Sequence, residues 1–367
     1  MSNWYNISDI DQLDTPALVV YPDRVKQNIA TLVGAIDNAD RLRPHVKTHK
    51  TKEVTQLCMD AGIRKFKCAT IAEAEMLALC NAPDVLLAYQ PIGPKIKRLV
   101  ALIKQYPATA FSCLVDNYEA AKAIDQIALA EQATLNVYID LNVGMNRSGI
   151  APQNAFVLYE RCELLQAVKV VGLHVYDGHI HDQDLNTRQQ KCDAAFKPVE
   201  ALITELHASG INPLVVAGGS PTFPIHAKRG GVECSPGTFV YWDSGYGAAF
   251  DEQQFLPAAL VVTRVVSLPD DTKICVDLGH KSIASENVLD KRVTFLNAPQ
   301  LKPVSHSEEH LVLEAGLNHD FKVGDVIYGV PHHICPTVAL YERAITIQNE
   351  KTSGQWRNIA RDRKINI

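Results

Sequence analysis

One short segment, Leu42-Arg-Pro-His-Val-Lys-Thr-His-Lys50, gathers basic side chains that are suited to covalent chemistry. Pro44 disfavours the helical conformation for the residue before it, so we expect the segment to be extended. Side chains alternate along an extended chain, which places those of Arg43, His45 and Lys47 on one face. Cationic neighbours and the loss of hydration lower the pKa of a lysine amine. The neutral amine of Lys47 could then form a Schiff base with a carbonyl compound.

Two further lysines compete with Lys47 by their position in the chain. Lys50 lies beyond the extended segment and is expected to start a helix, which makes an inward orientation less favourable, and Lys52 follows it. A solvated lysine at the end of a strand is the ordinary alternative for any of the three, because buried lysines are rare. Residue types and spacing alone therefore leave Lys50 as an alternative to Lys47.

A second candidate site is the turn Ala217-Gly-Gly-Ser-Pro-Thr222, which follows a predicted strand. Adjacent glycines let backbone N–H groups approach an anion, and nearby hydroxyls add further donors. Ser235–Thr238 offers another set of backbone donors after the next loop. Because the last two strand loops of a TIM barrel commonly bind phosphate, we expect a phosphate site here, with a plain tight turn as the alternative. The expected contacts are Gly218, Gly219, Ser220 and Thr222.

Other polar side chains follow the ends of two predicted strands. Arg147 lies between two glycines in Asn142–Gly149, where its guanidinium could donate to an anionic oxygen. His174 ends the strand Val168–His174 and could lie flat against an aromatic ring, and Tyr176 opens a polar run at the same place. The ordinary alternatives are a surface arginine and a structural histidine.

A possible metal pair occurs much later in the chain, in Pro331-His-His-Ile-Cys-Pro-Thr337. His333 and Cys335 are two residues apart, so on an extended chain both side chains would face one ion, whereas His332 would face the other side. Nitrogen and sulfur ligands together suit Zn²⁺, and two protein ligands leave coordination positions for water and substrate. The same spacing also occurs by chance, so the pair alone does not establish a metal site.

The elements that would position these residues alternate regularly from residue 16 to about residue 240. Apolar runs such as Ala17–Tyr21, Lys65–Cys68 and Leu135–Leu141 predict strands, and the stretches between the runs have helical spacing. Strands that alternate with helices form parallel βαβ units, and about eight such units predict a TIM-like (β/α)8 barrel. Phe239–Trp242, which includes Tyr241, is expected to close the series. An open doubly wound sheet is the alternative fold.

The pattern changes after about residue 245, where predicted strands follow one another with turns between them. These strands are Leu260–Ser267, Lys273–Leu278, Val293–Phe295, His310–Glu314 and Asp325–Val330. We therefore expect an α/β barrel domain over residues 16–244 and a mostly β domain over residues 245–367, joined by residues 1–15. The second domain would carry the metal pair.

Composition excludes several classes of protein. The formal net charge of the 367-residue chain is -5 and its charges are interspersed, so it lacks the basic stripe of a nucleic-acid-binding protein. The first residues show no signal peptide and the apolar runs are too short to span a membrane. The nine cysteines include no C-x-x-C pair, which suggests reduced thiols in the cytoplasm.

Combined, these motifs resemble those of the D-threonine aldolase and D-serine dehydratase family, which has the alanine racemase fold and uses pyridoxal 5'-phosphate (PLP). The most specific match is Arg-Pro-His-x-Lys-Thr-His-Lys at 43–50, and the likeness extends from Asp14 to Thr337. It implies that Lys47 carries PLP and that His333 and Cys335 bind a divalent metal, with zinc expected and manganese or magnesium as alternatives. It also implies that Gly218, Gly219, Ser220, Thr222, Arg147, His174, Tyr176 and Tyr241 contact the cofactor.

The resemblance implies a PLP- and metal-dependent lyase that acts on small D-β-hydroxy amino acids, and the family usually forms homodimers. A D-threonine aldolase-like retro-aldol cleavage to glycine and an aldehyde is slightly favoured. The alternative is a dehydratase acting on D-serine or D-threo-3-hydroxyaspartate, because the aldolases often have aspartate where this chain has Cys335. An amino-acid racemase, which needs no metal, and a non-catalytic PLP carrier protein, which would need only the barrel, are further alternatives.

Overall fold

The computed structural model describes residues 3–367, which form two compact units. The parallel unit consists of residues 32–47, 55–237 and 362–367. The mixed-sheet unit consists of the N-terminal segment as far as Thr31, residues 48–54 and residues 238–361. The two units thus interleave along the chain, whereas the sequence predicts a boundary near residue 244. Helices α1 (Pro22–Gly34) and α2 (Lys52–Asp60) each contribute residues to both units.

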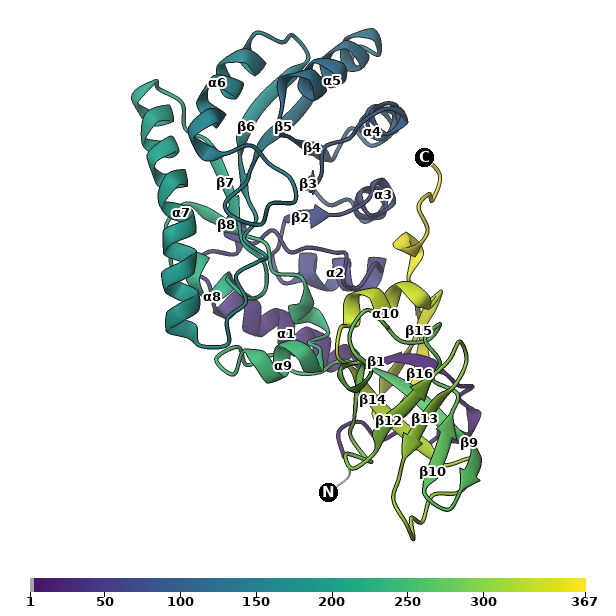
Figure 1. The fold of residues 1–367 in the computed structure, drawn as a ribbon. Coiled ribbons are helices and arrows are strands. Elements are labelled where there is room, and N and C mark those ends of the chain that lie inside the picture. The colour runs from purple at the N-terminus through teal and green to yellow at the C-terminus, as the bar shows by residue number, and fades with distance from the viewer. Residues whose placement is uncertain (1–2) are drawn as a thin grey trace. The chain divides into compact units, whose positions relative to one another are not determined.

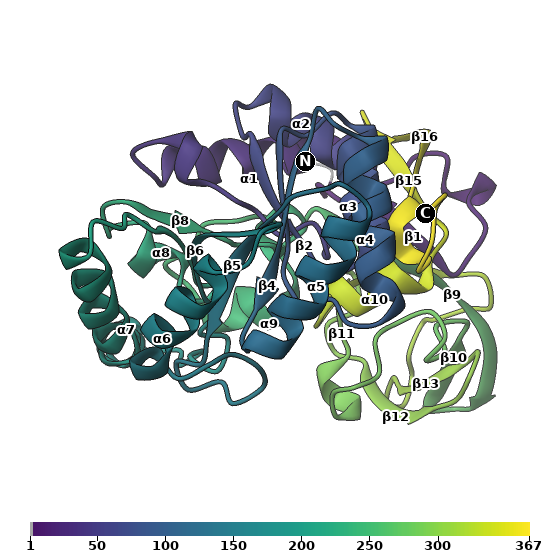
Figure 2. The same ribbon diagram turned by 90° about the horizontal axis from the view of Figure 1, so that it is seen from above.

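The parallel unit is built on a curled sheet of seven strands that pair in chain order, all in parallel (Figure 1). Its helices lie along the outer face of this sheet (Figure 2). The strands are β2 (Lys65–Cys68), β3 (Asp84–Leu87), β4 (Ala110–Val115), β5 (Leu135–Leu141), β6 (Val168–Val175), β7 (Leu214–Ala217) and β8 (Val232–Cys234). The helices are α3 (Ile71–Leu79), α4 (Pro94–Gln105), α5 (Tyr118–Ala130), α6 (Pro152–Glu163), α7 (Leu185–Ala208) and the short α8 (Phe223–His226).

The extended segment around Lys47 occupies the eighth position of this sheet. Isolated parallel bridges join Leu42 to Cys234 of β8 and His45 to Lys67 of β2. The Val46 N–H donates to the Lys67 carbonyl oxygen over 2.9 Å, so one segment is hydrogen-bonded to both edge strands. The predicted TIM-like arrangement of parallel strands is therefore confirmed, with seven regular strands and this segment between the first and the last.

Two predicted barrel strands are placed differently by the structure. β1 (Ala17–Val20) pairs with β9 and β15 of the mixed-sheet unit, because a short apolar run has the same pattern in either kind of sheet. Phe239–Trp242 is not a strand: a 3₁₀ turn covers Thr238–Val240, and the N–H groups of Tyr241 and Trp242 both donate to the Thr238 carbonyl oxygen. These local bonds satisfy backbone groups that a strand would pair with a neighbour, and Val232–Cys234 ends the parallel sheet instead.

The mixed-sheet unit confirms the predicted mostly β architecture of the C-terminal part. A strand occurs at each of the five predicted positions. β14 pairs with both β9 and β11, and the remaining strands follow the order β12-β13-β10-β9-β1-β15-β16. The strands are β9 (Ala259–Asp270), β10 (Lys273–Val276), β11 (Val293–Phe295), β12 (Lys302–His306), β13 (Leu311–Glu314), β14 (Val326–Pro331), β15 (Arg343–Gln348) and β16 (Lys351–Arg357), with helices α9 (Ser244–Ala249) and α10 (Ile334–Leu340).

Hydrophobic side chains such as Val261, Ile274, Leu313 and Ile327 form one core of this unit. Across residues 3–367, each helix is too short or too polar to cross a lipid bilayer.

A buried ion-pair network fixes the segment that carries Lys47. The side chain of Arg43 is fully buried, and its Nε lies 2.7 Å from the Glu233 carboxylate of β8. Its two terminal nitrogens lie 2.6 and 3.0 Å from the Asp84 carboxylate at the start of β3. Lys65, at the start of β2, also pairs with Glu233. Because a bidentate guanidinium–carboxylate pair has a defined geometry, this network orients the segment inside the parallel sheet.

We predict that Arg43→Met lowers the free energy of unfolding by about 3–5 kcal/mol, because it removes a buried charge partner from the buried Glu233 carboxylate and from the partly exposed Asp84. The matched control is Lys104→Met, which breaks the exposed Lys104–Glu131 pair and should cost less than about 1 kcal/mol. Urea unfolding of the three proteins measures the difference. An Arg43→Met loss no larger than that of the control would contradict this role.

Candidate active site

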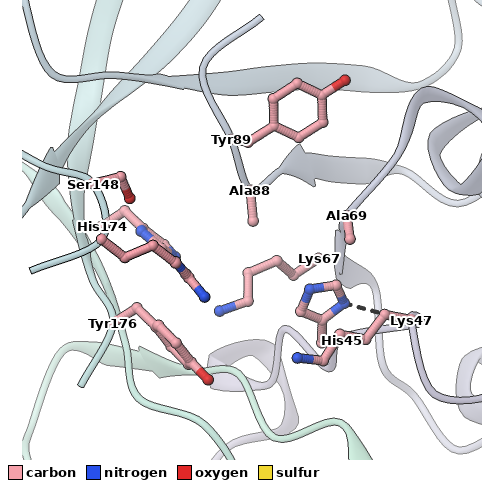
Figure 3. A pocket seen from close by; sticks show the side chains of 10 residues that line it. His45, Lys47, Lys67, Ala69, Ala88, Tyr89, Ser148, His174 and Tyr176 are labelled. Carbon is pink, nitrogen blue, oxygen red and sulfur yellow. Dashed lines mark hydrogen bonds between the residues drawn. The ribbon is translucent and has the colours of Figure 1, made fainter. Parts of the chain in front are cut away.

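A pocket opens where several parallel strands end. Lys67 of β2 and His174 of β6 each precede the last residue of their strand, and both side chains face the pocket (Figure 3). This is the end of a parallel barrel at which active sites form. Its charged and aromatic lining consists of His45, Lys47, Lys67, Tyr89, Arg147, His174 and Tyr176, all from the parallel unit.

Lys47 lies in this pocket, as the alternation of the segment predicts. Its side chain is half-buried, and its backbone N–H donates to Nδ1 of His45 over 3.2 Å (Figure 3). Lys50 and Lys52 do not line the pocket. Lys50 has a φ of 57° and precedes α2 rather than starting it, because the helix begins at Lys52. Of the three competing lysines, the structure places only Lys47 at the ends of the parallel strands.

His174 is held in a fixed orientation by a carboxylate behind it. Its Nδ1 lies 2.7 Å from Asp140 Oδ1, and the Ser148 hydroxyl donates to the other oxygen of Asp140 over 2.8 Å. Burial lowers the pKa of His174, so its ring is neutral, and the carboxylate fixes the proton on Nδ1. Burial opposes ionisation of Asp140, but the hydrogen bonds from His174 and Ser148, together with the nearby charges of His174 and Arg147, lower the pKa of the carboxyl. The buried Nε2 of His174 has no hydrogen-bond partner among the described residues.

Tyr176 lies between two cationic side chains. The Arg147 guanidinium is 5.1 Å from the centre of the Tyr176 ring, and the Lys67 amine is 5.4 Å from it. Arg147 is exposed, whereas the Lys67 side chain is buried and extends across the pocket toward His174 and Tyr176 (Figure 3). Cations contact aromatic rings favourably at such distances. The pocket therefore combines an aromatic ring with an excess of positive charge.

The predicted phosphate loop is a close-fitting glycine turn. Gly218 has a φ of 73°, and a Cβ atom there would lie 2.7 Å from the His226 ring. A Cβ on Gly219 would lie 3.2 Å from the ring of Tyr176, so the turn leaves room only for backbone. The Thr222 hydroxyl accepts from the Gly219 N–H and donates to Asp177 over 2.8 Å. Its proton is thus directed away from a ligand, and Thr222 shapes the loop.

A buried polar cluster that the sequence did not indicate supports this loop. His226 Nε2 lies 2.8 Å from Asp177 Oδ2 and 3.4 Å from the Cys192 sulfur. The three ligand-type atoms are all within 4.8 Å of one another. Because Asp177 also accepts from Thr222, the cluster connects α7 and α8 to the glycine turn. Ser220 is buried, and its oxygen accepts from the Gly237 N–H over 3.2 Å. Tyr241 is buried in the mixed-sheet unit.

The mixed-sheet unit brings His333 and Cys335 together, although not on an extended chain. His333 is the N-cap of α10, and Cys335 lies in the first turn of that helix. The extended backbone predicted for the pair is therefore wrong, because the helix begins between the two residues. Their side chains nevertheless hydrogen-bond to each other, and Thr48 Oγ1 lies 3.1 Å from the Cys335 sulfur. The first turn of a helix can thus bring together the side chains of two residues at this spacing.

A carboxylate orients the imidazole of His333. Glu286 Oε1 lies 2.6 Å from His333 Nδ1, which leaves Nε2 as the ring nitrogen available to a metal. Burial opposes protonation of His333, but its hydrogen bonds to Cys335 and Glu286 raise the pKa of the imidazole to about 9. Asp243 accepts from the Ile334 N–H, and burial raises the pKa of its carboxyl to about 6. A nitrogen and a sulfur donor with a carboxylate behind the imidazole suit a zinc ion.

Lys67, Asp140 and Glu286 were also not identified from the sequence as residues of these sites. Lys67 left a signal, because Lys65 and Lys67 alternate in a four-residue strand and must point to the same face. The sequence signal for Asp140 is weaker: it is an acidic residue near the end of a buried strand. Glu286 left none, since it comes from a loop 47 positions away from its partner His333.

Comparison with known proteins assigns the chain to a family. Residues 20–245 match the family model described as "Alanine racemase, N-terminal domain", so the chain belongs to that family. Residues 258–347 match a second model, "Putative serine dehydratase domain". The resemblance deduced from the Lys47 segment and the other motifs is thereby confirmed.

Several characterised relatives match nearly the whole chain. A D-threonine aldolase of Arthrobacter sp is 26% identical, with 95% of this chain and 93% of the relative covered. A 3-hydroxy-D-aspartate aldolase of Paracoccus denitrificans is also 26% identical, with 95% and 92% covered. A D-threo-3-hydroxyaspartate dehydratase of Delftia sp. is 23% identical, with 95% and 97% covered.

Solved structures share the fold. The crystal structure of D-threonine aldolase from Filomicrobium marinum superimposes with a TM-score of 0.89 at 24% identity, covering 98% of each chain. An alanine racemase of Clostridium difficile superimposes with a TM-score of 0.72 at 13% identity. Both likenesses confirm the alanine racemase fold.

Proposed function

We propose that this protein is a PLP- and divalent-metal-dependent lyase that cleaves D-β-hydroxy amino acids, with a D-threonine aldolase-like reaction. The observation that carries the proposal is the position of Lys47 in a cationic pocket at the ends of the parallel strands. The relatives that match over most of the chain are named as aldolases and a dehydratase of such amino acids, which supports the substrate class.

The pocket fits PLP in several respects. The glycine turn has room for backbone only, as a phosphate-binding turn requires, and Gly218, Gly219 and Ser220 would hold the phosphate. His174 has an unpartnered Nε2 and a ring fixed by Asp140, so it would lie against the cofactor ring together with Tyr176 and Arg147. When bound, the cofactor supplies an electron sink for negative charge at the substrate Cα. Thr222 and Tyr241 would complete its surroundings.

Lys47 would have two roles in the reaction. Its amine would hold the cofactor before substrate arrives and would then be released beside the substrate Cα. Once released, Lys47 could accept a proton at its nitrogen or return one there. The adjacent positive charges of Lys67 and Arg147 would also stabilise negative charge that develops in the pocket.

His333 and Cys335 would hold the divalent metal, which we propose to be zinc, with manganese or magnesium as alternatives. A metal bound there would lower the pKa of the substrate β-hydroxyl. Glu286 would keep the His333 imidazole oriented for coordination, as carboxylates commonly do behind metal-binding histidines. The family resemblance further supports a homodimer, and the nine free thiols are compatible with a reducing cytoplasm.

The alternative reaction is a dehydratase acting on D-serine or D-threo-3-hydroxyaspartate. The two reactions differ in the bond that is broken first: the Cα–Cβ bond in the aldolase and the Cα–H bond in the dehydratase. Cys335 favours the alternative, because the family resemblance places aspartate at this position in many of the aldolases.

We predict that the PLP-loaded protein with zinc or manganese converts D-threonine to glycine and acetaldehyde. L-threonine serves as the control and should remain unchanged. Product analysis by NMR distinguishes the alternatives, because 2-oxobutyrate and ammonia would indicate the dehydratase. If no D-β-hydroxy amino acid gives either set of products, both the aldolase and the dehydratase reaction are excluded.

We predict that His333→Ala and Cys335→Ala weaken zinc binding by more than about 100-fold and that Glu286→Gln weakens it by about 10–100-fold. His332→Ala is the matched control, because this neighbouring imidazole is directed toward Gly245 rather than Cys335. Competition with a chromogenic chelator measures the affinity. Equal losses in His332→Ala and His333→Ala would exclude the proposed pair.

A further inference from the structure

Lys67 is a buried amine whose charge has no direct partner. Its side chain is 2% exposed, and within residues 3–367 its amine makes no hydrogen bond or ion pair. Lys65, two residues earlier on the same strand face, has the Glu233 carboxylate as its partner. The two lysines of β2 therefore differ in their partners. Lys65 is paired with a carboxylate at the start of the strand, whereas Lys67 has no such partner among the described residues at the pocket.

The carboxylates nearest to Lys67 are already engaged. Asp140 pairs with His174, and Asp177 pairs with His226. Lys47 and Arg147 add further positive charge to the same pocket. A buried charge without a partner is costly, so a pocket with this excess is built to receive an anion.

The protonation of Lys67 reflects this environment. Burial, followed by the repulsion from Lys47, lowers the pKa of Lys67 to about 7. Asp177 and Asp140 act in the opposite direction, and Arg43 adds to the lowering. An anion beside the amine would favour its charged form and so would bind more tightly when that form is present.

We propose that Lys67 binds an anionic oxygen in the Lys47 pocket. The proposal rests on the proposed function, which brings two such oxygens to the pocket: the acidic ring hydroxyl of PLP and the carboxylate of the amino acid. The direction of the side chain toward His174 and Tyr176 places its amine beside the residues assigned to the cofactor ring (Figure 3). Lys67 is thus a binding residue in addition to Lys47.

Lys67→Met tests the proposal, since methionine has a similar length and no charge. Lys67→Arg retains the charge, and Lys65→Met is the matched control on the same strand face. In the PLP-free proteins we expect Lys67→Met to be at least as stable as the wild type at pH 6, because an unpaired buried charge is removed. Lys65→Met should lose stability, because Glu233 loses one of its two partners.

The pH dependence of stability in the PLP-free wild type is an independent test of the buried Lys67 amine. The pKa of Lys67 is lowered from the ordinary value of 10.5 for a lysine to about 7, so between these pH values the unfolded chain binds more protons than the folded protein. Stability therefore rises with pH across this window. The rise should be smaller in Lys67→Met than in the wild type and unchanged in Lys65→Met.

Ligand binding then identifies the source of the oxygen. If it is the cofactor's, Lys67→Met weakens PLP binding by about 10–100-fold and shifts the absorbance of bound PLP before any substrate is added. If it is the substrate's, the absorbance and PLP affinity stay unchanged, and the KM for D-threonine rises by about 10–100-fold while kcat changes little. Lys67→Arg should recover part of either loss.

The outcomes separate this proposal from the proposed function. A wild-type protein that shows no visible absorbance with PLP would overturn the proposed function and the role of Lys67 with it. A wild type that binds PLP, with a Lys67→Met variant that matches it in PLP affinity, absorbance and KM, would overturn the role of Lys67 alone.

Discussion

The bidentate ion pair of Arg43 with Asp84, shared with Glu233, is the interaction on which the site in the parallel unit depends. It fastens an irregular segment between β8 and β2, where backbone hydrogen bonds alone would hold only a few residues. Because side chains alternate along this segment, fixing Arg43 inside the sheet also directs His45 and Lys47 into the pocket. The position proposed for the reactive amine of Lys47 thus depends on Arg43, which does not line the pocket itself.

An excess of positive charge distinguishes the pocket from the ion-pair network around Arg43. In the network, each positive charge has a carboxylate partner. In the pocket, Asp140 is taken by His174, and Lys47, Lys67 and Arg147 remain with a surplus of positive charge. A protein tolerates such a surplus when a ligand supplies the missing negative charge. PLP, with its phosphate and its acidic ring hydroxyl, has the charge that this pocket lacks.

The sequence predicts the repeating parts of the fold well, because alternating strands and amphipathic helices leave a periodic pattern. Ala17–Val20 shows where this reasoning stops: its pattern establishes a strand but carries no information on the sheet it joins. The aromatic run at Phe239–Trp242 has strong strand propensity, yet local hydrogen bonds to Thr238 produce a turn. Local backbone hydrogen bonding overrides strand propensity there.

Site residues are predictable to the extent that they lie within one motif. Lys47, His333 and Cys335 were each proposed from local spacing and resemblance, although the helical backbone of Cys335 was not predicted. Glu286 could not be found, because it reaches His333 through the fold rather than through the sequence. Alternation along β2 places Lys67 on the same face as Lys65, but the sequence does not show that Lys67 alone is buried without a partner in the described part of the chain.

The central claim is that Lys47 carries the cofactor. Reduction of the PLP-loaded protein with borohydride makes the bond between cofactor and lysine permanent, and mass spectrometry of the digested protein then locates the added mass. We predict a single modified lysine, Lys47, in the peptide that spans the Arg43–Lys50 segment. Modification at Lys50, Lys52 or Lys67 instead, or a protein without added mass, would contradict the claim.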